Sequence, residues 1–128
     1  MTREEFIQIL DKKGYSYEII GHKIVITYRG DVNLSSLETL PPGVEFNNGR
    51  DVELALLKAL HPDVEFKNGG NVYLHSLKTL PPGVEFNNGR DVYLESLTGD
   101  WFSDWKGNVE GIDPNRLLNR MIKRGIFL

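Results

Sequence analysis

Three glutamates stand twenty residues apart in this sequence, and they are the first candidates for chemistry. Glu45, Glu65 and Glu85 each lie between a valine and a phenylalanine in the motif V-E-F. If the motif recurs on neighbouring strands, the carboxylates line up about 5 Å apart, where exposed charges repel by only about 1 kcal/mol or less. One interpretation is a solvated acidic face, and the other is a strip that binds a basic protein surface or mimics nucleic acid. We predict no metal site, because calcium takes about six or more oxygen ligands and each repeat offers one carboxylate.

A second set of polar and aromatic side chains differs from one repeat to the next. Two outward positions of the motif V-x-L-x carry the differences: Asn33, Glu53, Tyr73 and Tyr93 at the first, and Ser35, Ala55, His75 and Glu95 at the second. Aromatic and charged groups together suit a protein-binding hot spot. We therefore predict a partner-binding patch of Tyr73, Tyr93, His75, Glu53 and Glu95. The alternative is that the tyrosines only pack against each other across the strands.

Catalysis has little support in the sequence. His22, His61 and His75 show neither the H-x-x-x-H nor the H-E-x-x-H spacing of metal sites. The glycines follow the twenty-residue interval and form no phosphate-binding loop. Paired acids on neighbouring strands could hydrolyse glycosides, but a short stack of repeats leaves little room for a cleft. We predict a protein that is not an enzyme and has no catalytic residues and no cofactor.

An internal repeat of twenty residues positions these side chains. Residues 39–52 read TLPPGVEFNNGRDV, residues 79–92 read the same, and residues 59–72 read the diverged copy ALHPDVEFKNGGNV. We place full repeats at 30–49, 50–69 and 70–89, with a fourth that starts at Arg90 and departs from the pattern after Leu97. The apolar positions recur in six columns, which begin at Val32, Leu34, Leu37, Leu40, Val44 and Phe46.

Each repeat predicts two short strands joined by two corners. V-x-L and V-x-F have the period of two expected of strands with one buried face. Pro-Pro-Gly marks one corner, and Asn-Gly marks the other, where we expect the glycine to adopt a positive φ. Twenty residues cannot bury a core alone, so the repeats must stack, with Asn48, Asn68 and Asn88 forming a ladder of side-chain hydrogen bonds. An antiparallel meander is the alternative, but Arg50-Asp51 make the link longer than a two-residue hairpin.

Residues 1–29 depart from the repeat and predict an N-terminal cap. Thr2 can N-cap a helix with Glu4 and Glu5 in its first turn, and Gly14 ends that helix. Two strands follow at 17–20 and 23–28, with a turn at Gly21-His22. Such a cap covers the open strand edge of the first repeat.

Residues 98–128 predict a second cap. The aromatic side chains Trp101, Phe102 and Trp105 either seal the core or stack on a ligand. A capping helix follows, and it carries a basic stripe of Arg116, Arg120 and Lys123. This stripe is either a solvated helix face, whose charges suit the helix dipole, or a basic edge that meets an acidic partner or another copy of the chain.

The composition bounds the function. We expect one domain over residues 1–128. The net charge of −3 is too small to indicate direct binding to nucleic acid. No run approaches the roughly 20 apolar residues of a membrane span, and the acidic N-terminus does not resemble a signal peptide. The sequence has no cysteine, which fits a reducing compartment, and we expect a cytoplasmic protein.

The repeat pattern V-x-L-x-x-L-x-x-L-P-P-G-V-x-F-x-N-G resembles the short leucine-rich-repeat-like solenoids of bacterial and bacteriophage proteins, over residues 30–97. The resemblance implies a mainly β, short right-handed solenoid that serves as a recognition scaffold. The pattern departs from the leucine-rich signature, which has more leucines between strand and asparagine, so a plain β-solenoid is the rival. The resemblance also implies a narrower role, a phage-encoded inhibitor that blocks or sequesters a host defence component such as a CRISPR nuclease.

Together these observations predict a non-enzymatic module that binds a protein partner. One alternative is a structural solenoid that self-assembles through its terminal caps. The other is a binder of small ligands or carbohydrate through the tryptophans of residues 98–128.

Overall fold

The computed structural model describes residues 1–81, 84–94 and 96. It begins with helix α1 (Arg3–Lys13), as the sequence predicts. The Thr2 hydroxyl accepts a hydrogen bond from the Glu5 amide at 3.1 Å, and Gly14 ends the helix with φ 75°. Phe6 and Leu10 of this helix are fully buried. The predicted caps of the helix are therefore confirmed.

A hairpin follows α1 and joins it to the repeats. Strands β1 (Tyr17–Ile20) and β2 (Lys23–Ile26) pair in antiparallel register, and the turn between them places Gly21 at φ 62°. The second strand ends at Ile26, two residues before the predicted end. Strand β2 then pairs in parallel with the first repeat, so the hairpin extends a sheet of the repeats.

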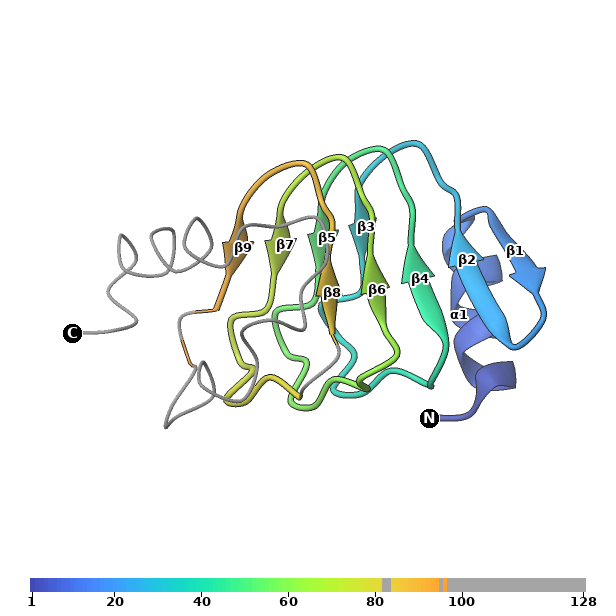
Figure 1. Cartoon of the computed structure of the whole chain (residues 1–128). Helices are drawn as coiled ribbons and strands as arrows, with labels where there is room; N and C mark the ends of the chain where they lie inside the picture. Colours follow the sequence, from blue (N-terminus) through green and yellow to red (C-terminus); the bar gives the residue numbers. More distant parts are fainter. Residues whose placement is uncertain (82–83, 95, 97–128) are drawn as a thin grey trace.

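The repeats contribute to two small sheets, in which the strands of the repeats run parallel to one another (Figure 1). The five-stranded sheet has the order β1-β2-β4-β6-β8 and includes β4 (Val44–Phe46), β6 (Glu65–Phe66) and β8 (Glu85–Phe86). The four-stranded sheet has the order β3-β5-β7-β9 and consists of β3 (Val32–Asn33), β5 (Val52–Glu53), β7 (Val72–Tyr73) and β9 (Val92–Tyr93). Each strand of the repeats pairs with the strand twenty residues later, as in Val32↔Val52 and Phe46↔Phe66. The predicted strands are thus confirmed, and the antiparallel meander is wrong.

A single apolar core lies between the two sheets. All described members of the six apolar columns are buried, as their spacing predicts. The rings of Phe46, Phe66 and Phe86 stack with nearly parallel planes (4° and 8°) and 5.2 Å between successive centroids. This separation is close to the spacing of paired strands, because the rings repeat with the strands that carry them.

Buried asparagines connect neighbouring repeats at one corner, because each side chain bonds to both. The Nδ2 of Asn48 donates to the Gly30 carbonyl of its own repeat at 3.1 Å and to the Asp51 carbonyl of the next repeat at 3.0 Å. Asn68 donates likewise to the Arg50 and Asn71 carbonyls at 3.0 and 3.1 Å, and Asn88 to the Gly70 and Asp91 carbonyls at 3.1 and 3.3 Å. The bonds described for these amides run from side chain to backbone, not from one asparagine side chain to the next as the predicted ladder implied.

The glycines at this corner have a different role from the one predicted. Among the described residues only Gly14, Gly21 and Gly43 have a positive φ. Gly49, Gly69 and Gly89 do not, so the expected positive φ at Asn-Gly is wrong. A Cβ at Gly89 would lie 2.6 Å from the Gly69 carbonyl oxygen, and the same clash occurs between Gly69 and Gly49. Glycine is needed here because the backbones of adjacent repeats approach too closely for a side chain.

The described part of the chain is therefore mainly β with one N-terminal helix. Each of the three full repeats contributes one strand to each sheet, so the outward side chains of successive repeats lie in rows across the sheets. No helix in residues 1–81, 84–94 and 96 has the length and apolarity that a membrane span requires.

Candidate functional site

Three aromatic side chains lie together on the outer surface of the four-stranded sheet. The Tyr73 and Tyr93 rings stack with centroids 4.6 Å apart and an angle of 27° between their planes. The His75 ring lies 5.7 Å from Tyr73 and 6.1 Å from Tyr93, measured between centroids. We call Tyr73, His75 and Tyr93 the aromatic face. The structure thus brings together three of the five residues of the predicted patch.

The repeat explains why these rings point outward. Val72 and Leu74 are fully buried, so the alternation of β7 turns Tyr73 to the opposite side. His75 lies in the turn after β7, and its ring lies beside both tyrosines. Tyr93 is the register partner of Tyr73 on the next strand. Both tyrosines are half-buried and His75 is exposed. The rings therefore leave part of their surface open to a partner.

Polar groups border the aromatic face. Glu53 lies in register with Tyr73 on the preceding strand and is half-buried. The side-chain amide Nδ2 of Asn71 donates a hydrogen bond to the Tyr73 hydroxyl at 3.1 Å, which holds that ring in place. Glu95, the fifth residue of the predicted patch, lies outside the described residues.

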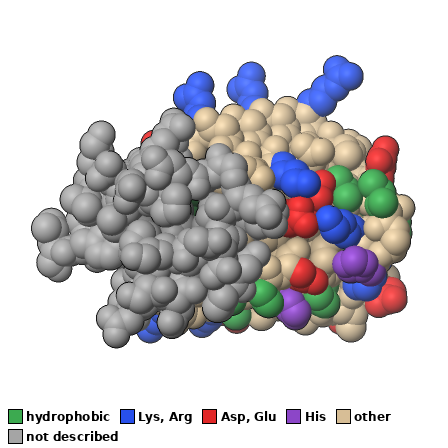
Figure 2. Space-filling model, in the orientation of Figure 1, with side chains coloured by type: hydrophobic (Ala, Val, Ile, Leu, Met, Phe, Trp, Pro, Cys, Tyr) green, Lys and Arg blue, Asp and Glu red, His purple; other side chains and the backbone are tan. Residues whose placement is uncertain are grey.

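The predicted glutamate strip differs from a solvated acidic face. Glu45 is only 8% exposed, so the expectation of exposure is wrong at this residue. Lys23 lies 3.5 Å from Glu45 and 2.9 Å from Glu65, while Lys67 lies 3.4 Å from Glu45 and 3.1 Å from Glu65. Figure 2 shows basic and acidic side chains next to each other on this side of the molecule. Glu85 is in register with Glu65, and its side chain is outside the described part.

The two lysines of this network, Lys23 and Lys67, were missed by the sequence reasoning. Lys67 occupies the position of Asn47 and Asn87, so the divergence of the middle repeat was an available signal. Lys23 comes from the hairpin, and its proximity follows only from the pairing of β2 with β4. The network joins the hairpin to the first two repeats, and it neutralises two of the three predicted acids.

The charges in this network shift each other's pKa. Burial alone raises the pKa of Glu65, but the hydrogen bonds from Lys23 and Lys67 together lower it below its ordinary value. The hydrogen bond to Glu65 raises the pKa of Lys23 and of Lys67. All three pKa shifts favour the charged forms, so Glu65, Lys23 and Lys67 are ionised at neutral pH.

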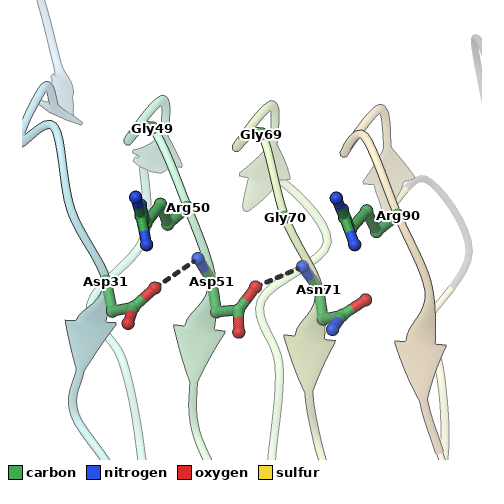
Figure 3. Close-up of a pocket in the computed structure, with 8 residues that line it drawn as sticks. All are labelled: Asp31, Gly49, Arg50, Asp51, Gly69, Gly70, Asn71 and Arg90. Carbon is green, nitrogen blue, oxygen red and sulfur yellow. Dashed lines mark hydrogen bonds between the residues drawn. The ribbon is translucent and has the colours of Figure 1, made fainter.

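A shallow hollow of roughly 520 Å³ lies at the asparagine corner of the four-stranded sheet (Figure 3). The Asp31 carboxylate accepts a hydrogen bond from the backbone amide of Asp51 at 3.0 Å. The Asp51 carboxylate accepts one from the backbone amide of Asn71 at 2.8 Å. Arg50 and Arg90 line the same hollow, with Gly70 between them. The acids are thus held by backbone amides of the next repeat. These bonds join repeats where the sheet ends, so their first role is structural.

The predicted basic stripe and tryptophan segment belong to residues 98–128. Arg116, Arg120 and Lys123, with the tryptophan segment, lie outside the described residues. Within residues 1–81, 84–94 and 96, no group of three or more histidines and carboxylates is arranged to hold a metal ion. Comparisons with protein families, with curated proteins and with solved structures found no match.

Proposed function

We propose that this chain is a non-enzymatic module that binds a protein partner through its aromatic face. The scaffold in this proposal is a short solenoid of twenty-residue coils capped by α1 and the β1–β2 hairpin. The parallel pairing of residues twenty apart in both sheets supports that architecture. Both arms of each coil contain a strand, and the described residues of the coils contain no helix, which favours a plain β-solenoid over a leucine-rich-repeat cross-section.

The observation that carries the proposal is the cluster of three outward rings on a repetitive scaffold. The inward residues are almost the same in every repeat, while the outward residues change from Asn33 and Glu53 to two stacked tyrosines. Tyrosine gives a large contact area with few rotatable bonds, so it is enriched in binding hot spots. A partly exposed tyrosine pair beside a histidine therefore suits contact with a protein.

A capture experiment tests this proposal. The immobilised full-length chain is compared with the double variant Tyr73→Ala/Tyr93→Ala in an extract of the source cells, and captured proteins are identified by mass spectrometry. The matched control is Ile19→Ala/Ile20→Ala, which removes exposed apolar surface from β1 (48% and 55% exposed). We expect a stoichiometric partner to bind the wild type and the control but not the tyrosine variant. An identical set of partners for all three proteins would contradict the assignment.

Self-assembly is the second candidate, and one observation favours it. Strand β1 is the outer strand of the five-stranded sheet, and it exposes Ile19 and Ile20. Exposed apolar edge strands are ready templates for pairing with another chain. Light scattering over a range of concentrations tests this candidate, because a constant monomer mass would exclude it.

Cytoplasmic action is part of the proposal and rests on the lack of cysteine. The narrower role as an inhibitor of a host defence component stays a prediction from the sequence resemblance.

A further inference from the structure

We infer that the aromatic face receives a cationic side chain, an arginine or lysine, of the partner protein. This inference rests on the proposed function and names the chemistry of the group that contacts the tyrosines. It follows from the stacked rings and from Glu53, which lies in register with Tyr73.

The row of outward positions that contains the tyrosines has one carboxylate and neither lysine nor arginine. The row consists of Asn33 on β3, Glu53 on β5, Tyr73 on β7 and Tyr93 on β9. A partner side chain that contacts this row therefore meets aromatic rings and the Glu53 carboxylate.

The geometry suits a cation over the tyrosines. A tyrosine face attracts an ammonium or guanidinium group within about 6 Å of its centroid. Glu53 is the register partner of Tyr73, so its strand runs about 4.8 Å away. A guanidinium that stacks on Tyr73 can thus donate to the Glu53 carboxylate at the same time. The flat, forked shape of arginine fits both contacts better than the ammonium of lysine.

Cations of the chain itself lie at the corners that end these strands. Arg50 and Arg90 line the hollow that also contains Asp31 and Asp51, so acids accompany them there. At the opposite corner Lys58 pairs with Glu38 at 3.2 Å. Glu53 is therefore the described charge nearest to the rings in the register of the sheet. A nucleic-acid strand whose bases stacked on the tyrosines would bring its phosphates against this carboxylate, which disfavours that ligand.

A peptide titration observed by NMR tests the inference on the full-length chain. The probes are blocked peptides Gly-Ser-Xaa-Ser-Gly in which Xaa is arginine, its neutral analogue citrulline, or glutamate. We expect the arginine peptide to shift the ring signals of Tyr73 and Tyr93 with a Kd of about 1–10 mM, as suits one side chain. Tyr17, whose hydroxyl donates to Asp11 at the N-terminal cap, serves as the internal control. The citrulline peptide should bind at least about fivefold more weakly than the arginine peptide, and the glutamate peptide should not bind.

Variants separate the two contacts. Glu53→Gln is expected to weaken binding of the arginine peptide about 2- to 5-fold. Glu18 is an exposed acid on β1, and Glu18→Gln should leave the affinity for this peptide unchanged. Tyr73→Phe keeps the ring and should retain binding, while Tyr73→Leu should lose it. Equal affinity for arginine and citrulline, or no shift with arginine, would overturn the inference.

Failure of the cationic contact and failure of the proposed function give different results. If the partner is lost by Tyr73→Ala/Tyr93→Ala but binds Glu53→Gln as well as wild type, the module stands and the cationic contact is wrong. If the arginine peptide binds but the tyrosine variant captures the same proteins as wild type, the proposed function fails at this surface.

Discussion

Replacing Lys67 by asparagine makes the middle repeat match its neighbours, and we predict that it destabilises the protein. In repeat proteins a return to the common residue usually stabilises. Here Lys67 lies 3.4 Å from Glu45 and 3.1 Å from Glu65, and Glu45 is only 8% exposed. The variant Lys67→Asn leaves Lys23 as the one cation that the structure places against these acids.

The magnitude follows from the exposure of the groups. The Lys67 side chain is 41% exposed, so each of its two ion pairs is worth about 0.2–1 kcal/mol. Breaking a buried pair outright costs about 3–5 kcal/mol, but Lys23 still lies 3.5 Å from Glu45 and limits the loss. We therefore expect Lys67→Asn to lower the free energy of unfolding by about 1–2 kcal/mol.

Urea unfolding at neutral pH, followed by circular dichroism, measures this change. The matched control is Lys58→Asn, because Lys58 pairs with Glu38 at 3.2 Å while both side chains are more than 60% exposed (68% and 62%). We expect the control to change stability by less than about 0.5 kcal/mol. If Lys67→Asn is as stable as wild type or more stable, the network contributes nothing and the reasoning is refuted.

The pH dependence gives a second check on the same variant. The pKa of Glu65 is lowered in the folded protein, so its contribution is present above its unfolded value of 4.5 and disappears as the pH falls through the lowered folded pKa. The pKa of Lys67 is raised, so its contribution is present below 10.5 and is lost as the pH rises through the raised folded pKa. The stability difference between wild type and Lys67→Asn should therefore be largest between these limits and should shrink in acid. A difference that stays constant down to about pH 2 would show that the effect is not electrostatic.

Three further substitutions test how the repeats stack. Gly69→Ala would place a Cβ against the Gly49 carbonyl oxygen, and we expect it to lower the free energy of unfolding by at least about 1–3 kcal/mol, measured by thermal or urea unfolding. The control Gly21→Ala lies at a turn with open space and should lower stability less. The reverse order would contradict the clash. Asn68→Ala removes two hydrogen bonds to backbone carbonyls, at 3.0 and 3.1 Å, which should lower stability by about 1–3 kcal/mol; an unchanged urea midpoint would show that water replaces both. Phe66→Ala removes the middle ring of the phenylalanine stack. We expect the free energy of unfolding, measured by calorimetry, to fall by about 3–5 kcal/mol. A fall of less than about 1 kcal/mol would mean that neighbouring side chains move into the cavity.

The sequence predicted the arrangement of strands because the period was regular and the apolar positions alternated within it. Val72 and Leu74 had to point inward, so Tyr73 between them had to point outward. The helix ends at Thr2 and Gly14 were also readable, because capping depends on local hydrogen bonds. These features involve neighbours along the chain or residues at a fixed interval of twenty.

The glycine corner was predicted for the wrong reason, and the acidic strip was predicted with the wrong environment. Asn-Gly is a common turn with positive φ, but the structure requires Gly49 and Gly69 because another backbone passes close to them. Glu45 appeared to be outward and solvated, yet Lys23 from the hairpin and Lys67 from the next repeat lie against it. Neither contact can be inferred from spacing within one repeat.

The sequence by itself determined the repeat, the inward and outward faces and the rows in which side chains recur, since each follows from the chain's own periodicity. Only the tertiary structure decided how the rows meet: how closely two corners approach, which cation reaches which acid, and that Tyr73, His75 and Tyr93 lie within 4.6 to 6.1 Å of one another. The physical reason is that burial, charge pairing and ring stacking depend on distances across the stack, and those distances exist only when the repeats are packed together.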